Sequence, residues 1–227
     1  MDSDPTFRLA ELAALGPYFA LQDAGAAVSG DWQPVTVAVT DADRLSELID
    51  RVAVRLGGTS RWIAASVFYQ GWAARLTSIY AGSIVLGSPV PDLGLDRLHV
   101  RVPVSGPAQL LGAPLIAVSA DAGWRRLTDD HLTMLAAAIR GQVRIGAQLL
   151  RGNLAAALAG SLSALAGQVP LADLLRHEWA QPAELARYGQ WFDTRPGPRY
   201  FRTTCCGFDR VPGGGRCGDC SLARPRG

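Results

Sequence analysis

The four cysteines of this chain are its clearest candidates for chemistry. Cys205, Cys206, Cys217 and Cys220 form the pattern C-C-x10-C-x2-C near the end of the 227-residue sequence. Cysteine thiolates bind zinc, hold iron–sulfur clusters and form disulfides. The 22 basic residues are all arginine, which excludes chemistry that needs a lysine, such as Schiff-base catalysis or a Walker A motif. The cysteines are therefore the predicted functional site, and we expect no catalytic residue beyond them.

Disulfides are the least favoured of these three possibilities. The N-terminal residues 1–5 are acidic and lack the basic and apolar regions of a secretory signal. We therefore expect a cytoplasmic protein, in which disulfides are rare. Vicinal cysteines also bond to each other only with strain.

Structural zinc and a [2Fe-2S] cluster both fit the spacing. Four thiolates close a tetrahedral zinc site, and Cys217-Gly218-Asp219-Cys220 is an ordinary chelating turn. Zinc sites usually pair two such turns, whereas here the second half is the adjacent pair Cys205-Cys206. Neighbouring side chains of an extended chain point to opposite faces, so this pair suits the edge of a two-iron cluster. The spacing alone leaves both possibilities open.

The residues around the cysteines suit a negatively charged cluster. Gly213, Gly214, Gly215 and Gly218 carry no Cβ and allow the backbone to approach closely. Residues 195–227 contain seven arginines and two aspartates. An oxidised four-thiolate [2Fe-2S] cluster carries a charge of about −2, so this segment would remain positive with the cluster bound.

The segment resembles the C-terminal motif of the FhuF-like ferric-siderophore reductases. The resemblance rests on Arg202, on the four cysteines at their spacing, and on the sequence Val211-Pro212-Gly213-Gly214-Gly215 between them. In that family the four cysteines ligate one [2Fe-2S] cluster. The resemblance assigns the same role here to Cys205, Cys206, Cys217 and Cys220.

The resemblance also implies a function and its partners. It implies transfer of one electron to an Fe(III)-siderophore, which releases the iron as Fe(II) in the cytoplasm. The electron would come from a donor of the ferredoxin or flavin reductase type, and the resemblance allows peripheral attachment to a membrane siderophore importer. Two alternatives stay open: a non-enzymatic interaction protein with a structural four-cysteine zinc site, and a [2Fe-2S] electron-transfer or sensor protein.

Other motifs give no comparable signal. His99, His131 and His177 are far apart in sequence, and we expect structural or solvated roles for them, with His131 at a helix surface. The pattern Gly213-x-Gly215-x-x-Gly218 matches the dinucleotide fingerprint but lacks the strand and helix that the fingerprint requires. The formal net charge is only +2, which gives no case for nucleic-acid binding.

The hydrophobic periodicity predicts the elements that must position the cysteines. We expect five helices: residues 6–15, 40–57, 59–80, 128–150 and 154–166. The second starts at a capping box at Thr40 and ends at Gly57, and the fourth starts at an N-cap at Thr128. Gly152-Asn153 is expected to break the chain between the last two. We expect strands over 35–39, 98–102 and 115–118. Pro170 and Pro182 each suit the start of a short helix.

The predicted fold class is α+β and helix-rich. Residues 1–193 are expected to form one globular body, in which the siderophore docks, and residues 194–227 a small [2Fe-2S]-binding segment. The uncharged stretches, residues 76–91 and the residues between Arg151 and Asp173, are too short or too polar to span a membrane, so we interpret them as buried core helices. Tyr200 and Phe201 are expected to pack the segment onto the body.

Overall fold

The structure, a computed structural model, describes residues 6–25, 28, 30–103, 105–195 and 197–224. Residues 1–5, on which the prediction of no secretory signal rests, and Arg226 lie outside this part of the chain. The predicted helix-rich α+β fold is confirmed. The α-helices are α1 (Leu9–Ala14), α2 (Val35–Thr40), α3 (Ala42–Arg55), α4 (Arg61–Val85), α5 (Ala120–Arg125), α6 (Thr133–Gln142), α7 (Ala147–Leu165) and α8 (Leu171–Leu174).

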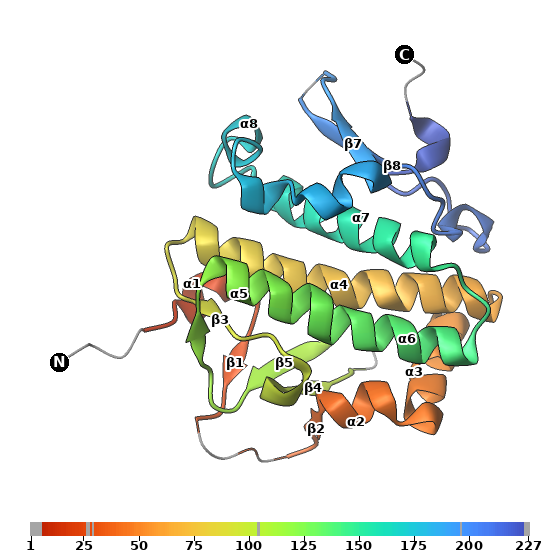
Figure 1. Ribbon diagram of the computed structural model, residues 1–227. Helices are drawn as coiled ribbons and strands as arrows, with labels where there is room; N and C mark the ends of the chain where they lie inside the picture. The colour runs from red at the N-terminus through yellow and green to blue at the C-terminus, as the bar shows by residue number, and fades with distance from the viewer. Residues whose placement is uncertain (1–5, 26–27, 29, 104, 196, 225–227) are drawn as a thin grey trace.

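Two long apolar helices, α4 and α7, form the centre of the body. They run side by side, and the α5–α6 helix covers α4 on another side (Figure 1). Helices that are apolar on all faces must be covered all round, and both bury most of their length. The interpretation of the two uncharged stretches as core helices is therefore confirmed up to Val85 in the first and up to Leu165 in the second; Val90–Pro91 form a strand instead. Among the described residues, no helix combines the length and apolarity needed to cross a bilayer.

The strand predicted over 35–39 is wrong. These residues belong to α2, which buries Val35, Ala38 and Val39. The three side chains are spaced i, i+3 and i+4, so a helix gathers them on one face. Burial of that face outweighs the modest preference of β-branched residues for strands.

The capping box predicted at Thr40 is also wrong, by one residue. Asp41 is the N-cap of α3, and its carboxylate accepts a hydrogen bond from the backbone N–H of Arg44 at 2.9 Å. The hydroxyl of Thr40 instead donates to the carbonyl of Thr36 at the end of α2. The apolar face of α3 and its end before Gly57 are as predicted.

The helix predicted to begin at Thr128 begins earlier. Ser119 is the N-cap of α5, and its hydroxyl accepts from the backbone N–H of Ala122. A π-helical section, Arg126–Leu132, then joins α5 to α6 in one continuous helix (Figure 1). Thr128 lies inside this helix and donates to the carbonyl of Trp124 at 2.9 Å. Its capping signal is therefore unused.

The break predicted at Gly152-Asn153 lies instead at residues 143–146, between α6 and α7. Helix α7 continues through both residues because tertiary contacts use them. A Cβ at Gly152 would lie 2.0 Å from the hydroxyl oxygen of Thr204, so only glycine lets the C-terminal segment approach here. The buried Asn153 side chain donates to the carbonyl of Ser66 on α4 at 2.9 Å.

Short strands pack on the side of the α5–α6 helix away from α7 (Figure 1). A four-stranded sheet has the order β1 (Gln22–Asp23), β5 (Gln109–Gly112), β4 (Leu98–Arg101) and β2 (Gln33–Pro34), and β3 (Val90–Pro91) pairs with β6 (Ala117–Val118). The antiparallel register places Val100 of β4 opposite Leu110 of β5. The strand predicted over 98–102 is confirmed as β4. Of the strand predicted over 115–118, only the last two residues form a strand, β6, and β5 was not predicted.

A hairpin carries the chain from the body to the cysteines. It consists of β7 (Gly189–Phe192) and β8 (Arg199–Arg202), lies against α7, and contains the predicted division at residue 193 in its turn (Figure 1). Tyr200 is half-buried against the hydrophobic core, which confirms its predicted packing. Phe201 is buried, and its ring lies against that of Phe192 across the hairpin.

The remaining elements are short. As predicted, Pro170 immediately precedes α8 and Pro182 precedes a 3₁₀ helix. The 3₁₀ helices are Leu95–Arg97, Glu178–Ala180, Ala183–Tyr188, Phe208–Arg210 and Ser221–Ala223.

Candidate metal centre and the adjoining cavity

All four cysteines lie in residues 203–224, the cysteine segment, which follows β8 and folds back onto it. The backbone N–H of Arg202 in β8 donates to the carbonyl of Asp219 at 3.0 Å. The end of the segment is therefore hydrogen-bonded to the strand that precedes its start. Cys206 and Cys220 are buried, and Cys205 and Cys217 are half-buried.

The sulfurs of Cys206 and Cys217 lie 3.7 Å apart. Two thiolates bound at about 2.3 Å to one tetrahedral ion lie about 3.8 Å apart, so this pair has the separation of two ligands that share an ion. The hydrogen bond from the Cys217 thiol lowers the pKa of Cys206 to about 6, and the positive charge of Arg202 acts in the same direction. The same hydrogen bond raises the pKa of Cys217. One member of the pair is thus readily available as a thiolate.

Cys205 has different neighbours. Its sulfur accepts a hydrogen bond from the backbone N–H of Gly207 at 3.4 Å and donates to the carboxylate of Asp209 at 3.3 Å. Burial raises the pKa of Cys205, and the charge of Asp209 adds to this rise. A carboxylate beside a ligating thiolate would repel it, so ligation by Cys205 requires the Asp209 side chain to turn away.

The types of donor, rather than their arrangement, fit a thiolate-bound metal group. Four sulfurs belong to one short segment, one pair has ion-sharing separation, and a backbone N–H already points at a third sulfur. Within the described ranges, no three His, Cys, Asp or Glu side chains are gathered so that they could hold one metal ion.

Glycine allows the cysteine segment to pack tightly. Gly207, directly after the cysteine pair, has φ +84°, and a Cβ there would lie 2.6 Å from the Trp62 ring. A Cβ at Gly214 would lie 2.5 Å from the backbone carbonyl oxygen of Phe208. At Gly214 the close contact is therefore with the loop itself, whereas a Cβ at Gly213, Gly215 or Gly218 would meet no atom within 4 Å. The predicted approach of the backbone to a cluster stays a prediction.

A buried polar network fastens the segment to both central helices. The Arg202 side chain has no exposed surface and forms an ion pair with Asp219, which lies between Cys217 and Cys220. The Arg202 guanidinium also donates to the side-chain oxygen of Asn153 on α7 at 2.7 Å. Asn153 in turn donates to the backbone and the hydroxyl of Ser66 on α4, each at 2.9 Å. The position of the Cys217–Cys220 turn is therefore tied to the α4–α7 pair.

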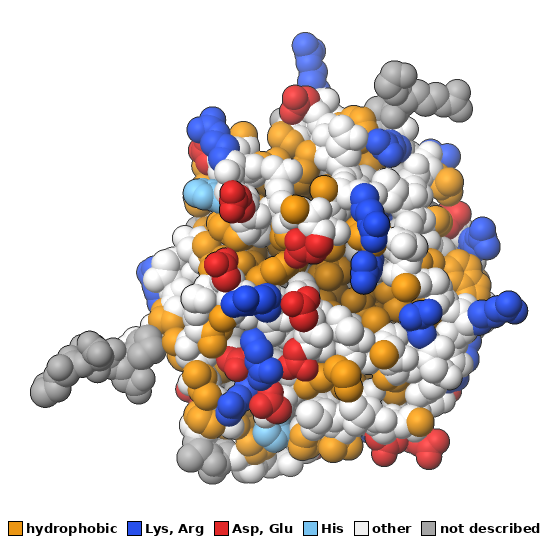
Figure 2. Space-filling view, in the orientation of Figure 1, with side chains coloured by type: hydrophobic (Ala, Val, Ile, Leu, Met, Phe, Trp, Pro, Cys, Tyr) orange, Lys and Arg blue, Asp and Glu red, His pale blue; other side chains and the backbone are white. Residues whose placement is uncertain are grey.

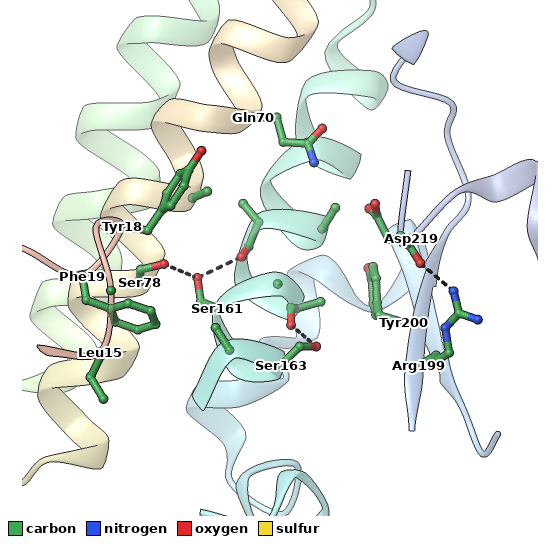
Figure 3. A pocket seen from close by; sticks show the side chains of 18 of the residues that line it. Leu15, Tyr18, Phe19, Gln70, Ser78, Ser161, Ser163, Arg199, Tyr200 and Asp219 are labelled. Atoms are coloured by element: carbon green, nitrogen blue, oxygen red, sulfur yellow. Dashed lines mark hydrogen bonds between the residues drawn. The ribbon is translucent and has the colours of Figure 1, made fainter. Parts of the chain in front are cut away.

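A cavity of about 710 Å³ lies beside this turn. Gly218 and Asp219, the two residues between Cys217 and Cys220, form part of its wall. The rest comes from α7, α4, the loop after α1 and the start of β8. Figure 3 shows Tyr18 and Phe19 on one side of the cavity and Tyr200 and Arg199 on the other. The cavity therefore extends from the helical body to the chelating turn.

The cavity lining is largely apolar and contains several neutral polar groups. Small residues of α7, among them Ala156 and Gly160, leave the space open. The hydroxyl of Ser161 is hydrogen-bonded to that of Ser78 across the helix pair at 2.9 Å (Figure 3). Arg199 lies at the edge, where its guanidinium donates to the carbonyl of Gly218 at 3.2 Å. A volume and lining of this kind are typical of small-molecule sites.

The histidines take no part in this site. His131 is fully buried rather than at a helix surface: its Nε2 accepts from the Trp72 indole at 2.9 Å, and its Nδ1 lies 2.7 Å from the carbonyl oxygen of Leu93. Burial lowers the pKa of His131 to about 4. The prediction of a structural role agrees with these contacts, and the predicted surface position is wrong.

Sequence reasoning did not find Asn153, the pairing of Arg202 with Asp219, or the cavity. One signal was present: Asn153 is a polar residue within a long apolar helix, and such residues are retained where they have buried partners. The lining residues of the cavity are mostly alanine, serine and glycine, which carry no motif.

Comparisons with known proteins add no name to this site. A scan against protein-family models found no match, and a search of curated proteins found no similar sequence.

Proposed function

We propose that this chain binds a [2Fe-2S] cluster through Cys205, Cys206, Cys217 and Cys220 and reduces a ferric siderophore held in the adjoining cavity. The observation that carries this proposal is the shared wall: the residues between Cys217 and Cys220 also line the cavity. A ligand in the cavity would contact the turn that holds two of the four thiolates.

The redox change is confined to one electron. When bound, a [2Fe-2S] cluster supplies a one-electron redox centre. The electron originates from a reduced donor protein, which is oxidised by one electron, and Fe(III) in the chelate becomes Fe(II). Oxygen donors hold Fe(II) less strongly because its charge is lower, so the iron is released. No proton or covalent bond is transferred.

The side chains of this chain orient the cysteine turn and bind the chelate. The Arg202–Asp219 ion pair fixes the Cys217–Cys220 turn against the body. Tyr18, Phe19 and Tyr200 supply aromatic surface to the walls of the cavity. The hydroxyl groups and Gln70 offer neutral hydrogen-bonding groups to the oxygen-rich surface of a chelate.

Filling the cavity tests the proposal. Gly160 is an exposed cavity-lining residue of α7, and a Cβ there meets no atom within 4 Å. Gly160→Ala and Gly160→Trp therefore both suit the helix, but only tryptophan occupies the cavity. Holoprotein reduced by dithionite is mixed anaerobically with a ferric trihydroxamate, and Fe(II) is trapped by a coloured chelator. We expect wild-type rates for Gly160→Ala and a loss of about tenfold or more for Gly160→Trp, with the same iron and sulfide content.

Removal of a ligand supplies the complementary measurement. Cys206→Ser should lose acid-labile sulfide and abolish Fe(III) reduction, because a hydroxyl replaces a thiolate ligand. Equal reduction by wild type and Gly160→Trp, or by the cluster-free Cys206→Ser variant, would refute the proposal.

A structural zinc site remains the second candidate, because the 3.7 Å sulfur separation suits zinc as well as iron. Metal analysis separates the two. One zinc and no sulfide per chain would establish an interaction protein, whereas about two irons and two sulfides would establish the cluster.

A further inference from the structure

Four exposed arginines surround the cysteine segment, and we call them the arginine rim: Arg199, Arg210, Arg216 and Arg224. Within the described residues, none of the four forms an ion pair with a carboxylate. Among the same residues, some arginines of the body, such as Arg44 and Arg126, do form such pairs, and others, such as Arg125, do not. Positive charge that is left uncompensated on one side of a molecule is available to a partner.

Three of the four rim guanidinium groups, those of Arg199, Arg210 and Arg224, have neutral contacts. Arg210 lies over the Trp62 ring at 5.6 Å and Arg224 over the Phe192 ring at 5.3 Å. Arg224 also donates to the side-chain oxygen of Gln190 at 3.0 Å. Groups positioned in this way lose little conformational freedom when a partner binds.

Acidic side chains do not cancel this charge. Of the acids in residues 203–224, Asp219 is paired with the buried Arg202, and Asp209 contacts the sulfur of Cys205. Figure 2 shows the same asymmetry on one face: basic side chains predominate on the side where the cysteine segment lies, and acidic ones gather over the opposite side.

We propose that the arginine rim is the docking surface for an acidic one-electron donor protein. This inference rests on the proposed function, because it requires a redox centre held by the cysteines. Arg210, Arg216 and Arg224 do not line the cavity. They belong to different parts of the cysteine segment, so the rim covers a wider surface than a small chelate in the cavity would contact. A protein with a negative surface complements it, and the donor gives up one electron without any transfer of bonds or protons.

Charge reversal with a matched control tests the inference. Arg216→Glu changes the rim, and Arg125→Glu makes the same change in net charge at an exposed arginine of α5. Within the described part of the chain, Arg125 has no carboxylate partner. The probe is a reduced plant-type [2Fe-2S] ferredoxin, an acidic protein, mixed with oxidised holoprotein in a stopped-flow instrument at several ionic strengths.

We expect the bimolecular rate constant of the rim variant to fall about tenfold or more at low ionic strength and to lose its salt dependence. The control variant should stay within about twofold of wild type, because α5 lies at the end of the α5–α6 helix away from the cysteine segment (Figure 1). Redox titration of both variants separates a change in driving force from a change in docking.

Three results would overturn the inference. The first is an equal loss of rate in both variants, and the second is a salt-independent rate in wild type. The third is rim-dependent binding of a DNA oligonucleotide that is tighter than the binding of ferredoxin. Failure of the proposed function is a separate result: rim-dependent reduction by ferredoxin with no reduction of ferric chelate would keep the docking surface and refute the siderophore reductase.

Discussion

Replacement of Arg202 by methionine should loosen the cysteine segment from the body. Methionine keeps most of the unbranched aliphatic volume but removes the guanidinium that contacts Asp219 and Asn153. The Arg202 side chain is 0% exposed and that of Asp219 is 20% exposed. The variant therefore leaves a largely buried carboxylate without its partner.

The expected cost follows from these contacts. Breaking a buried ion pair by removing one partner costs about 3–5 kcal/mol, and the lower value applies here because Asp219 can still reach water. The Asn153 side-chain oxygen also loses its donor, which adds about 1 kcal/mol. We expect a total of about 4 kcal/mol in the free energy of opening the segment. Since each 1.36 kcal/mol is a factor of ten, the equilibrium population of the open segment should rise by about a thousandfold.

Cysteine accessibility measures this opening directly. Cys220 is 2% exposed, so its thiol reacts with an alkylating reagent when the segment opens. Alkylation of metal-free, reduced protein is followed by mass spectrometry, and we expect a rate increase of about 10²–10³ for Arg202→Met. The control is Arg202→Met/Asp219→Asn, which removes the unpaired charge and should recover about 1–2 kcal/mol. An alkylation rate that rises by less than tenfold in Arg202→Met would refute the reasoning. So would a double variant whose segment opens as readily as expected if the effects of the two substitutions simply added.

Two further predictions concern the segment loop and the core. Gly207→Ala should lower the free energy of unfolding, measured with urea, by about 1–3 kcal/mol more than Gly213→Ala does. Both glycines have positive φ, but only Gly207 lies against Trp62. Equal losses would show that backbone strain alone matters. For His131, the unfolded chain takes up a proton at its ordinary pKa near 6.5, whereas the buried neutral ring resists protonation down to about pH 4. The free energy of unfolding should therefore fall as pH drops through that window, by a total on the order of 3 kcal/mol. His131→Gln should lack this part of the pH dependence, and an identical slope in the variant would contradict the assignment.

The sequence predicted those features whose signal is local. The spacing of the cysteines, the apolar faces of α3 and α4, and the alternation in β4 are all properties of neighbouring residues, and the structure agrees with the predicted helices and strand. The glycines and arginines near the cysteines were also visible, because their types alone imply close approach and positive charge.

Local signals failed where two elements compete for the same residues. Thr128 has the features of a helix start, yet the helix already begins at Ser119 and continues through it. Val35, Ala38 and Val39 fit either a strand or a helix by propensity, and burial on one face selected the helix. Gly152 carries a helix-breaking signal, but α7 passes through it because Thr204 packs there.

The sequence by itself therefore determined the set of donor residues, four cysteines at a fixed spacing, and left both zinc and a [2Fe-2S] cluster open as the group they would hold. Only the tertiary structure decided what lies beside them. The Arg202–Asp219–Asn153 network joins residues from β8, the cysteine segment and α7, and the cavity is enclosed by residues from both ends of the chain. Burial of charge and enclosure of space depend on contacts between residues far apart in the chain, so no pattern of neighbouring residues could specify either.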